Sequence, residues 1–524
     1  MRVTMPTVRD AVVCLLRELG MTTIFGNPGS TELPFFREFP DDFRYVLGLQ
    51  ESIVVGMADG YAQATRNAAL VNLHSAAGVG HAMGNIFTAY RNRTPLVITA
   101  GQQARSILPY EPFLFATQAT RLPEPYVKWS SEPARGEDVP GAIARAYHVA
   151  MQAPCGPTFV SIPVDDWDRT SEPIARRTVS RTSHPDPDLI ATIAGQLDRS
   201  ARPAFVVGPG VDRNDAWDQV VELAERHQAL VWVSSMSSRC SFPERHPLFA
   251  GFLPAIREHI VKCLDGHDLI VAFGAPVFTY HIEGFGPHIP PGSDLIQMID
   301  DGDVAAWTPV GTAIVCSVRH GAAALLERSH PPARPAPPGR AAPAKVNPGD
   351  RISMAYLMQT LSELRPSDSV IVEESPSSRR AMQKHLPIER PHSYFTCASG
   401  GLGYSLPAAV GLSLALSPTR KVIGLFGDGA SMYSIQALWS AADLKLPLTV
   451  VIVNNGGYAA LAEFSSHFNI KQLVGTRLPG IDFVGLARSM SCNAARVERP
   501  DDLHSALTAA LQSPVPYLVD VAVE

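Results

Sequence analysis

The chain has 524 residues, of which 46% are apolar, so it is long enough for about three domains with sizeable cores. Its net charge of −6 gives no electrostatic case for binding nucleic acid, and no uncharged apolar run reaches the roughly 18 residues that a membrane span needs. Seven cysteines are scattered without a CxxC pair. They indicate a reducing compartment, the cytoplasm, rather than a disulfide framework or a zinc site.

Helices and strands alternate through residues 1–180, which predicts a first α/β domain with a mostly parallel sheet. Three expected strands run directly into residues that could carry chemistry. The strands and these residues are Thr22–Phe25 with Ser30, Arg44–Leu49 with Glu51, and Ala69–Leu73 with His74. Because ligands bind at the carboxyl ends of parallel strands, we expect the three side chains to gather at one edge of the sheet.

Each of these residues also has a simpler interpretation. Ser30 could be a helix N-cap, His74 a histidine satisfied within the fold, and Glu51 a first-turn residue facing a helix dipole. Glu51 lies within the apolar segment LQESIVVGMADGYA, where a carboxylate is costly. That cost favours a functional role for Glu51.

Residues 186–328 repeat the α/β pattern and predict a second domain, reached through a polar, proline-bearing connection at 181–190. Gly208-Pro209-Gly210 follows a strand but lacks the GxGxxG fingerprint, so we interpret it as a turn. The Pro- and Ala-rich residues 329–350 predict an extended linker without a packing pattern. The expected strands of this domain are Ala204–Val207, Leu230–Val233, Leu269–Phe273, Leu295–Ile299 and Ala313–Ser317.

Residues 351–524 predict a third α/β domain, centred on two strands that end in small or oxygen-bearing residues. Val422–Phe426 runs into Gly427-Asp428-Gly429, a helix is expected over Tyr433–Leu444, and Leu448–Val453 runs into Asn454-Asn455-Gly456-Gly457. The Asp428 carboxylate, the Asn455 amide and the Gly457 carbonyl are oxygen ligands of the kind that Mg²⁺ or Ca²⁺ takes. A lone Gly-Asp-Gly triplet is most simply a turn, and the spaced Asn-Asn pair is what favours a metal site.

Ser377 and Ser378 follow the expected strand Val370–Val372 and precede a helix. Hydroxyls and backbone N–H groups at such a position suit a phosphate, although a simple helix cap is the alternative.

Several stretches together resemble the benzoylformate decarboxylase family, thiamine diphosphate enzymes of the pyruvate decarboxylase and acetolactate synthase superfamily. They are FGNPGSTELPFF, FRYVLGLQE, ADGYAQATR, NLHSAAGVG, GAPVFTYH, and the Gly-Asp-Gly and Asn-Asn pair. The resemblance implies three α/β domains, the middle one Rossmann-like, and the non-oxidative decarboxylation of a 2-oxo acid. The reaction that the resemblance implies first is the conversion of benzoylformate to benzaldehyde and CO₂, a step of mandelate degradation.

The resemblance also implies roles for particular residues. Glu51 would hydrogen-bond N1′ of the cofactor's aminopyrimidine and so promote loss of the C2 proton of the thiazolium. Ser30 and His74 would contact the substrate carboxylate and relay protons, with His281 as a second acid–base histidine. The ion held by Asp428, Asn455 and Gly457 would be Mg²⁺ or Ca²⁺ on the cofactor's diphosphate.

Further contacts are implied for the cofactor and for the substrate pocket. Gly400 would accept a hydrogen bond from the 4′-amino group, and Leu402 would support the bent cofactor. The other cofactor contacts are Ser377, Ser378, Gly427, Gly429, Ala430, Ser431 and Tyr458, and the pocket adds Phe113, Leu114, Ala460, Leu461 and Phe464. The family further implies a homodimer or homotetramer with sites at subunit interfaces.

The chain departs from the family pattern at several of these positions. Ala430 replaces a serine, Gly457 a threonine, Phe113 the first of two pocket leucines, and Ala462-Glu463 an Arg-Trp pair. The changes at Phe113 and Ala462-Glu463 leave open another 2-oxo acid decarboxylase, aliphatic or indole, or a carboligating lyase. A non-catalytic thiamine diphosphate-binding protein is the alternative from another class. The acid–base residues argue against it.

Overall fold

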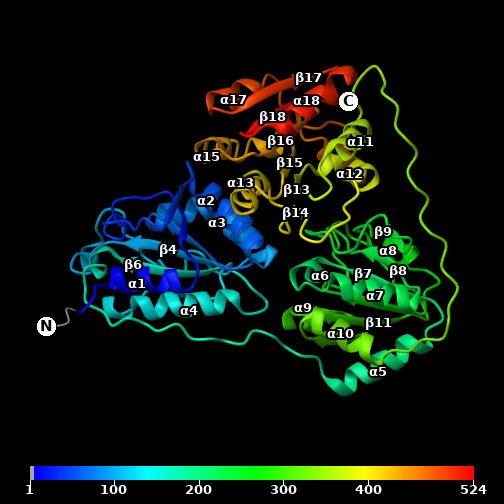
Figure 1. The fold of residues 1–524 in the computed structure, drawn as a ribbon, viewed down its shortest axis with the longest axis horizontal. Helices are drawn as coiled ribbons and strands as arrows, with labels where there is room; N and C mark the ends of the chain where they lie inside the picture. The colour runs from blue at the N-terminus through cyan, green and yellow to red at the C-terminus, as the bar shows by residue number, and fades with distance from the viewer. Residues whose placement is uncertain (1–4) are drawn as a thin grey trace. The chain divides into compact units, whose positions relative to one another are not determined.

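The computed structural model describes residues 5–524 (Figure 1). Three sheets of mostly parallel strands with flanking helices confirm the predicted α/β class. The chain forms two compact units. Unit 1 contains the chain up to Ser180 with Pro348–Arg379 and Ser399–Glu524, and unit 2 contains Arg181–Asn347 with Arg380–Ala398. The division into three domains stays a prediction. In the part of the chain that is described, no helix is long and apolar enough to cross a membrane.

The first sheet lies in unit 1 and has the strand order β2-β1-β3-β4-β6-β5. Helix α1 shows why local sequence forms these elements: the Thr7 side chain caps it in a capping box with Asp10, and its apolar face is buried. The strands are β1 (Thr23–Gly26), β2 (Arg44–Leu47), β3 (Ala69–Leu73), β4 (Leu96–Gln102), β5 (Ser130–Ser131) and β6 (Thr158–Pro163). The helices are α1 (Val8–Glu18), α2 (Glu51–Thr65), α3 (Ser75–Asn92) and α4 (Val139–Met151), with 3₁₀ turns η1 (Leu108–Tyr110), η2 (Gly136–Asp138) and η3 (Val164–Asp166).

The second sheet lies in unit 2 and has the order β12-β11-β10-β7-β8-β9. Its central strands are continuously apolar and buried, as expected when helices cover both faces of a parallel sheet. The strands are β7 (Pro203–Val207), β8 (Leu230–Val233), β9 (Phe249–Phe252), β10 (Leu269–Phe273), β11 (Asp294–Ile299) and β12 (Thr312–Val315). The helices are α5 (Pro187–Arg199), α6 (Pro209–Arg213), α7 (Trp217–His227), α8 (Arg257–Cys263), α9 (Gly302–Trp307) and α10 (Val318–Arg328).

Five strands of the third sheet lie in unit 1, in the parallel order β13-β15-β16-β18-β17. They are β13 (Val370–Glu374), β15 (Val422–Gly427), β16 (Thr449–Asn454), β17 (Asn493–Val497) and β18 (Tyr517–Ala522). The associated helices are α11 (Met354–Leu364), α13 (Ser405–Leu416), α14 (Asp428–Ser431), α15 (Ala437–Asp443), α16 (Ala459–Ser465), α17 (Phe483–Ser489) and α18 (Pro500–Gln512), with 3₁₀ turns η4 (Pro376–Ser378) and η5 (Ser466–Phe468). Helix α12 (Arg379–His385) and strand β14 (Tyr394–Thr396) lie between η4 and α13 in the sequence.

Two details differ from the sequence expectations. The helix predicted over Tyr433–Leu444 begins only at Ala437, because the N–H groups of Tyr433 and Ser434 donate three residues back and form tight turns. The linker is also not free of packing. Arg334 donates hydrogen bonds to the carbonyls of Leu197 (2.7 Å) and Ser200 (2.7 Å), which holds the start of the linker at the C-terminal end of α5 within unit 2.

Helices α2 and α13 pack with their backbones in close approach. A Cβ atom at Gly411 would overlap the carbonyl oxygen of Met57, and one at Gly60 would overlap that of Ala408. Two glycines on facing helices thus allow a contact that any side chain would prevent. This contact joins the segment of the first sheet to that of the third within unit 1.

A buried polar network lies in the same contact. Asp59 of α2 is fully buried and accepts hydrogen bonds from the hydroxyl of Tyr404 (2.8 Å) and from the amides of Gln63 and Asn92. Burial raises the pKa of Asp59, and the hydrogen bonds oppose that rise. Since Tyr404 immediately precedes α13, the network sets how α13 meets α2.

The beginning of α13 is held by a second buried carboxylate. Glu374, the last residue of β13, accepts hydrogen bonds from the backbone N–H groups of Gly403 (2.6 Å), Tyr404 (3.1 Å) and Ser405 (2.7 Å). Burial raises the pKa of Glu374 to about 7, although the three N–H donors favour its charged form. Glu374 therefore fixes the loop that leads from Gly400 to α13.

Replacing Gly411 with alanine should destabilise the protein, because the new methyl group has no space against Met57. We expect a loss of about 1–3 kcal/mol, measured as a lower thermal unfolding midpoint. Gly84→Ala in α3 is the matched control, because a Cβ there meets nothing within 4 Å. Equal unfolding midpoints for the two variants would contradict the close contact of α2 and α13.

Glu374 should make stability depend on pH. Its folded pKa of about 7 lies above the ordinary 4.5, so its contribution is fully present below about pH 4.5 and is lost as pH rises through 7. Relative to Glu374→Gln, the wild type should lose roughly 3 kcal/mol of unfolding free energy over this range. Unfolding measured at intervals between these pH values tests this, with the exposed Glu363→Gln as control. A difference independent of pH would contradict it.

Candidate active site

The topology brings together the three strand ends that the sequence singled out in the first sheet. Strand β1 lies between β2 and β3, with Gly26 in register with both Leu47 and Asn72. Ser30, Glu51 and His74 follow these three neighbouring strands, so they lie at the same edge of the sheet. This placement agrees with the expectation, and the roles of the three residues stay predictions.

Glu51 is the first residue of α2, which begins after the N-cap Gln50. The Gln50 side chain accepts from the Ser52 N–H (2.7 Å), so this residue, which the sequence analysis did not single out, fixes the helix start. The Glu51 side chain is 14% exposed, and its Oε2 lies 3.1 Å from Nδ1 of His81 on α3. A carboxylate held at this edge can hydrogen-bond a ring nitrogen of a bound cofactor.

His74 lies immediately before α3 with its ring one-fifth exposed. Its Nδ1 is 2.8 Å from Oε2 of Glu32, a buried carboxylate that the sequence analysis also missed. The charged residue within FGNPGSTELPFF was the available signal. Ser30 precedes Glu32 by two residues and is exposed in the turn after β1. Ser30 and Glu32 therefore lie on the same loop.

The proposed pocket residues Phe113 and Leu114 lie on the loop after β4. Phe113 is 88% exposed, whereas Leu114 adopts a left-handed backbone (φ 66°) and its carbonyl accepts from the Ser75 hydroxyl (2.6 Å). Ser75 is itself left-handed (φ 51°). Such strained residues persist only where contacts hold them, and they are common at functional sites.

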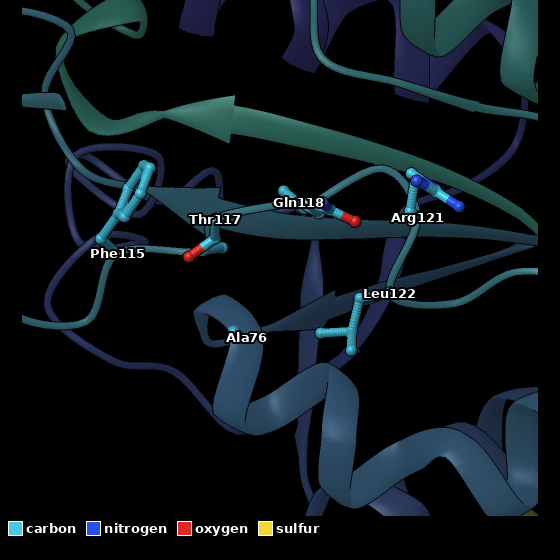
Figure 2. Close-up of a pocket in the computed structure, with 8 residues that line it drawn as sticks. Ala76, Phe115, Thr117, Gln118, Arg121 and Leu122 are labelled. Atoms are coloured by element: carbon cyan, nitrogen blue, oxygen red, sulfur yellow. The ribbon is translucent and has the colours of Figure 1, made fainter. Parts of the chain in front are cut away.

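A cavity of about 490 Å³ adjoins this loop. Figure 2 shows Ala76 at the beginning of α3, below the loop that carries Thr117, Gln118 and Arg121. Ala76 is two residues from His74, so the cavity lies beside the candidate site. Phe115 and Leu122 add apolar surface to its lining.

In the third sheet, the predicted metal ligands follow two paired strands. Gly427 of β15 is in register with Val453 of β16, so Asp428 and Asn455 emerge at neighbouring strand ends. Asp428 Oδ1 accepts from the Gly429 N–H (2.8 Å), while Oδ2 is buried without a hydrogen-bond partner. Burial raises the pKa of Asp428, although backbone N–H groups oppose it.

An orphaned, buried carboxylate oxygen is costly unless a cation or donor satisfies it. Asp428 Oδ2 is therefore suited to ligate a divalent cation, and the Asn455 side-chain oxygen and the Gly457 carbonyl could be further oxygen ligands. In residues 5–524 no cluster of three or more His, Cys, Asp or Glu side chains offers a metal site. A site here would depend on the amide and carbonyl oxygens.

The serines proposed for the diphosphate lie beside this point. Strand β13 pairs with β15, and Ser377 and Ser378 follow it in the turn η4. The Asn455 amide lies 3.4 Å from the Ser377 hydroxyl, and the Ser378 hydroxyl is 2.7 Å from that of Ser375. Ala430 and Ser431 are buried in α14, which begins directly after Gly427. Ser377, Ser378, Ala430, Ser431 and Asn455 thus follow the carboxyl ends of the neighbouring strands β13, β15 and β16.

Tyr458 covers the Gly-Asp-Gly turn. A Cβ at Gly429 would overlap the Tyr458 ring, so a side chain at this position would have to displace that ring. Burial, followed by the neighbouring Tyr433 and Asp428, raises the pKa of Tyr458. Helix α16 begins with the next residue and carries the proposed pocket residues Ala460, Leu461 and Phe464, of which Leu461 is half exposed.

The loop proposed to hold the aminopyrimidine and thiazolium rings precedes α13. Gly400 has φ 75° and is exposed, with nothing near the place of a Cβ atom, and Leu402 is partly buried. The Ser399 hydroxyl lies 2.9 Å from that of Thr88 on α3. This hydrogen bond ties the loop to the segment of the first sheet.

His281 is the one proposed site residue outside unit 1. It lies in unit 2, in the segment after β10, with its backbone N–H donating to the Ala255 carbonyl (2.9 Å). Its role as a second acid–base histidine stays a prediction.

Comparisons with known proteins agree on one family. Models of thiamine pyrophosphate enzymes match the chain in three parts: the N-terminal binding domain at residues 6–119, the central domain at 190–325 and the C-terminal binding domain at 377–521. The chain is 44% identical to benzoylformate decarboxylase of Pseudomonas aeruginosa, over 99% of each chain.

Solved structures give the same result. A thiamine diphosphate-dependent 4-hydroxybenzoylformate decarboxylase of Rhodococcus jostii RHA1 is 44% identical with a TM-score of 0.96. Benzoylformate decarboxylase of Polynucleobacter necessarius is 40% identical with a TM-score of 0.97, and each comparison covers 99% of both chains. The chain therefore belongs to the benzoylformate decarboxylase family of thiamine diphosphate-dependent enzymes.

Proposed function

We propose that this chain is a thiamine diphosphate- and Mg²⁺-dependent decarboxylase of 2-oxo acids, with benzoylformate as its preferred substrate and benzaldehyde and CO₂ as products. The observation that carries the proposal is the buried, unpartnered Oδ2 of Asp428 at the end of β15, within a chain of this family. The carboxylate has a use there if a cation bridges it to a diphosphate.

The residues present fit the cofactor at both of its ends. Asp428, Asn455 and the Gly457 carbonyl would hold the cation, and Ser377 and Ser378 the diphosphate. When bound, thiamine diphosphate supplies the nucleophilic carbon and the electron sink for decarboxylation. Other proposed contacts with the cofactor are Gly400, Leu402, Gly427, Gly429, Ala430, Ser431 and Tyr458.

The chain's own residues would orient the substrate and move protons. Glu51 would hold the aminopyrimidine through its carboxylate, which the helix start at Gln50 places at the sheet edge. Ser30 and His74, on one edge of the same sheet, would hold the substrate carboxylate, a contribution of geometry more than of affinity. His74 and His281 would donate or accept protons as carbon dioxide leaves and the aldehyde forms.

A second substrate deserves a direct test because of one relative. The Rhodococcus jostii RHA1 enzyme acts on 4-hydroxybenzoylformate and is as similar to this chain as the Pseudomonas enzyme is. The exposed Phe113 and Leu461, on the loop after β4 and on α16, would line the aryl end of the pocket. Differences at Phe113 and Ala462 are the reason to compare several 2-oxo acids.

The proposal includes a homodimer or homotetramer that acts in the cytoplasm, within mandelate degradation if benzoylformate is the substrate. Self-association is supported by exposed apolar side chains, among them Phe113, Phe468 and Val474 at 88%, 71% and 83% exposure. A reducing compartment is supported by the seven cysteines, none of which forms a disulfide.

The first test is CO₂ release by the apo-protein with benzoylformate, 4-hydroxybenzoylformate, pyruvate, 2-oxoisovalerate, phenylpyruvate or indolepyruvate. We expect turnover only with added thiamine diphosphate and Mg²⁺, fastest on benzoylformate, because the aryl pocket and the metal site must both be filled. Faster turnover of another acid would keep the chemistry and change the substrate. Absence of turnover on every acid, with cofactor bound, would favour a carboligase or a non-catalytic protein.

Glu51→Gln separates an enzyme from a protein that only binds the cofactor. We expect turnover to fall by roughly 100-fold or more while thiamine diphosphate still binds, because the amide cannot take the place of the carboxylate in proton chemistry. Binding is followed by titration calorimetry, and the exposed Glu363→Gln of α11 is the control. Unchanged turnover in Glu51→Gln would contradict the proposed role.

A further inference from the structure

We propose that Glu32 is a positioning residue for the proposed decarboxylation: it holds His74 in the tautomer with the proton on Nδ1, so that Nε2 is the nitrogen that exchanges protons with the substrate. The inference rests on the proposed function for its catalytic consequence. The tautomer itself depends only on the contacts between three side chains and two backbone amides.

Glu32 is a carboxylate in a buried position. Its side chain is 1% exposed, and it lies on the turn between β1 and β2. A charge in such a place is costly unless hydrogen bonds or an opposite charge compensate it. Its partners therefore decide what the residue can do.

Four donors surround the two carboxylate oxygens. Oε1 accepts from the Gly101 N–H (2.9 Å) and from the Thr31 hydroxyl (2.6 Å), and Oε2 accepts from the Gly29 N–H (2.9 Å). The remaining neighbour of Oε2 is Nδ1 of His74 at 2.8 Å. As an ionised carboxylate with three donors already around it, Glu32 can only accept a hydrogen bond from the ring.

The contacts of Thr31 agree with this assignment. Its single hydroxyl proton points to Glu32 Oε1, so its oxygen can only accept from His74 Nδ1, which lies 3.2 Å away. Nδ1 thus faces two acceptors and must carry a proton. The neutral ring then has an unprotonated Nε2.

Close backbone contacts keep the ring and the carboxylate in place. A Cβ at Gly29 would overlap the His74 ring, and a Cβ at Gly101 would overlap Glu32 Oε1 and the Thr31 side chain. The two glycines therefore let backbone N–H groups reach the carboxylate and let the ring approach the turn closely. The ring has little room to turn and exchange its two nitrogens.

The arrangement fits the proton relay proposed for His74. Nε2 accepts a proton and the ring becomes a cation, while Nδ1–H stays bonded to Glu32, whose negative charge compensates the new positive charge at 2.8 Å. Return of the proton from Nε2 restores the starting state. The proton on Nδ1 takes no part in this exchange.

The test combines nitrogen NMR of histidine-labelled protein with kinetics. At mildly alkaline pH, the His74 signals, assigned by their loss in His74→Ala, should show a protonated Nδ1 and a bare Nε2. Glu32→Gln should mix the tautomers and lower kcat on benzoylformate by roughly 10- to 100-fold. Glu32→Asp, which keeps the charge, should restore part of both.

Asp166→Asn is the matched control, because Asp166 is equally buried in the same unit but pairs with Arg105 at 2.7 Å instead of a histidine. It should leave the His74 signals unchanged, and thermal unfolding verifies that each variant is folded. A wild-type ring protonated on Nε2, or unchanged signals and kcat in Glu32→Gln, would overturn the inference. If the wild type decarboxylates none of the acids, the proposed function fails, and the ring signals still test the tautomer.

Discussion

Helices α2 and α13 meet through glycine in unit 1, and the placement of two segments of the candidate site depends on this contact. Gly60 and Gly411 bring the two backbones together, and Asp59 and Tyr404 add a hydrogen bond that is hidden from water. Glu51 is at the beginning of α2, and the loop with Gly400 and Leu402 precedes α13. The contact thus fixes how the segment that carries Glu51 and the loop that carries Gly400 lie relative to one another within unit 1. A shift of about 1 Å in such positioning can cost a large factor in rate.

Several buried carboxylates lie around the candidate site, and they differ in their hydrogen-bond partners. Glu374 is surrounded by backbone N–H groups, Glu32 by two amides, a hydroxyl and an imidazole, and Asp428 has one oxygen without a partner. Full satisfaction indicates a part of the scaffold, whereas the unsatisfied oxygen of Asp428 indicates a place for a ligand. The hydrogen-bond inventory therefore distinguishes residues that build the site from those that would bind within it.

Much of the fold and of the candidate site could be predicted from the sequence, because strand ends coincide with marked residues. Asp428 and Asn455 follow continuous apolar runs, so their place at neighbouring strand ends needed only the alternation of helix and strand. Glu32 could not be found this way. The proposed role of Glu32 depends on its contacts with Gly101, 69 residues away in the sequence, and with His74 at another strand end. Neither contact leaves a local sequence pattern. The late start of the helix at Ala437 and the anchoring of Arg334 are likewise effects that local propensity does not reveal.

The anchor of the loop after β4 has a consequence for how substrate preference can change. Ser75 holds that loop through the backbone carbonyl of Leu114, a group that every amino acid possesses. The side chains of Leu114 and Phe113 are therefore not needed to hold the loop in place. The exposed Phe113 can change in size and polarity with little loss of the loop's conformation, whereas the left-handed backbone of Leu114 restricts the residues that fit there. Phe113 is therefore the position in this loop that is best suited to change substrate preference during evolution.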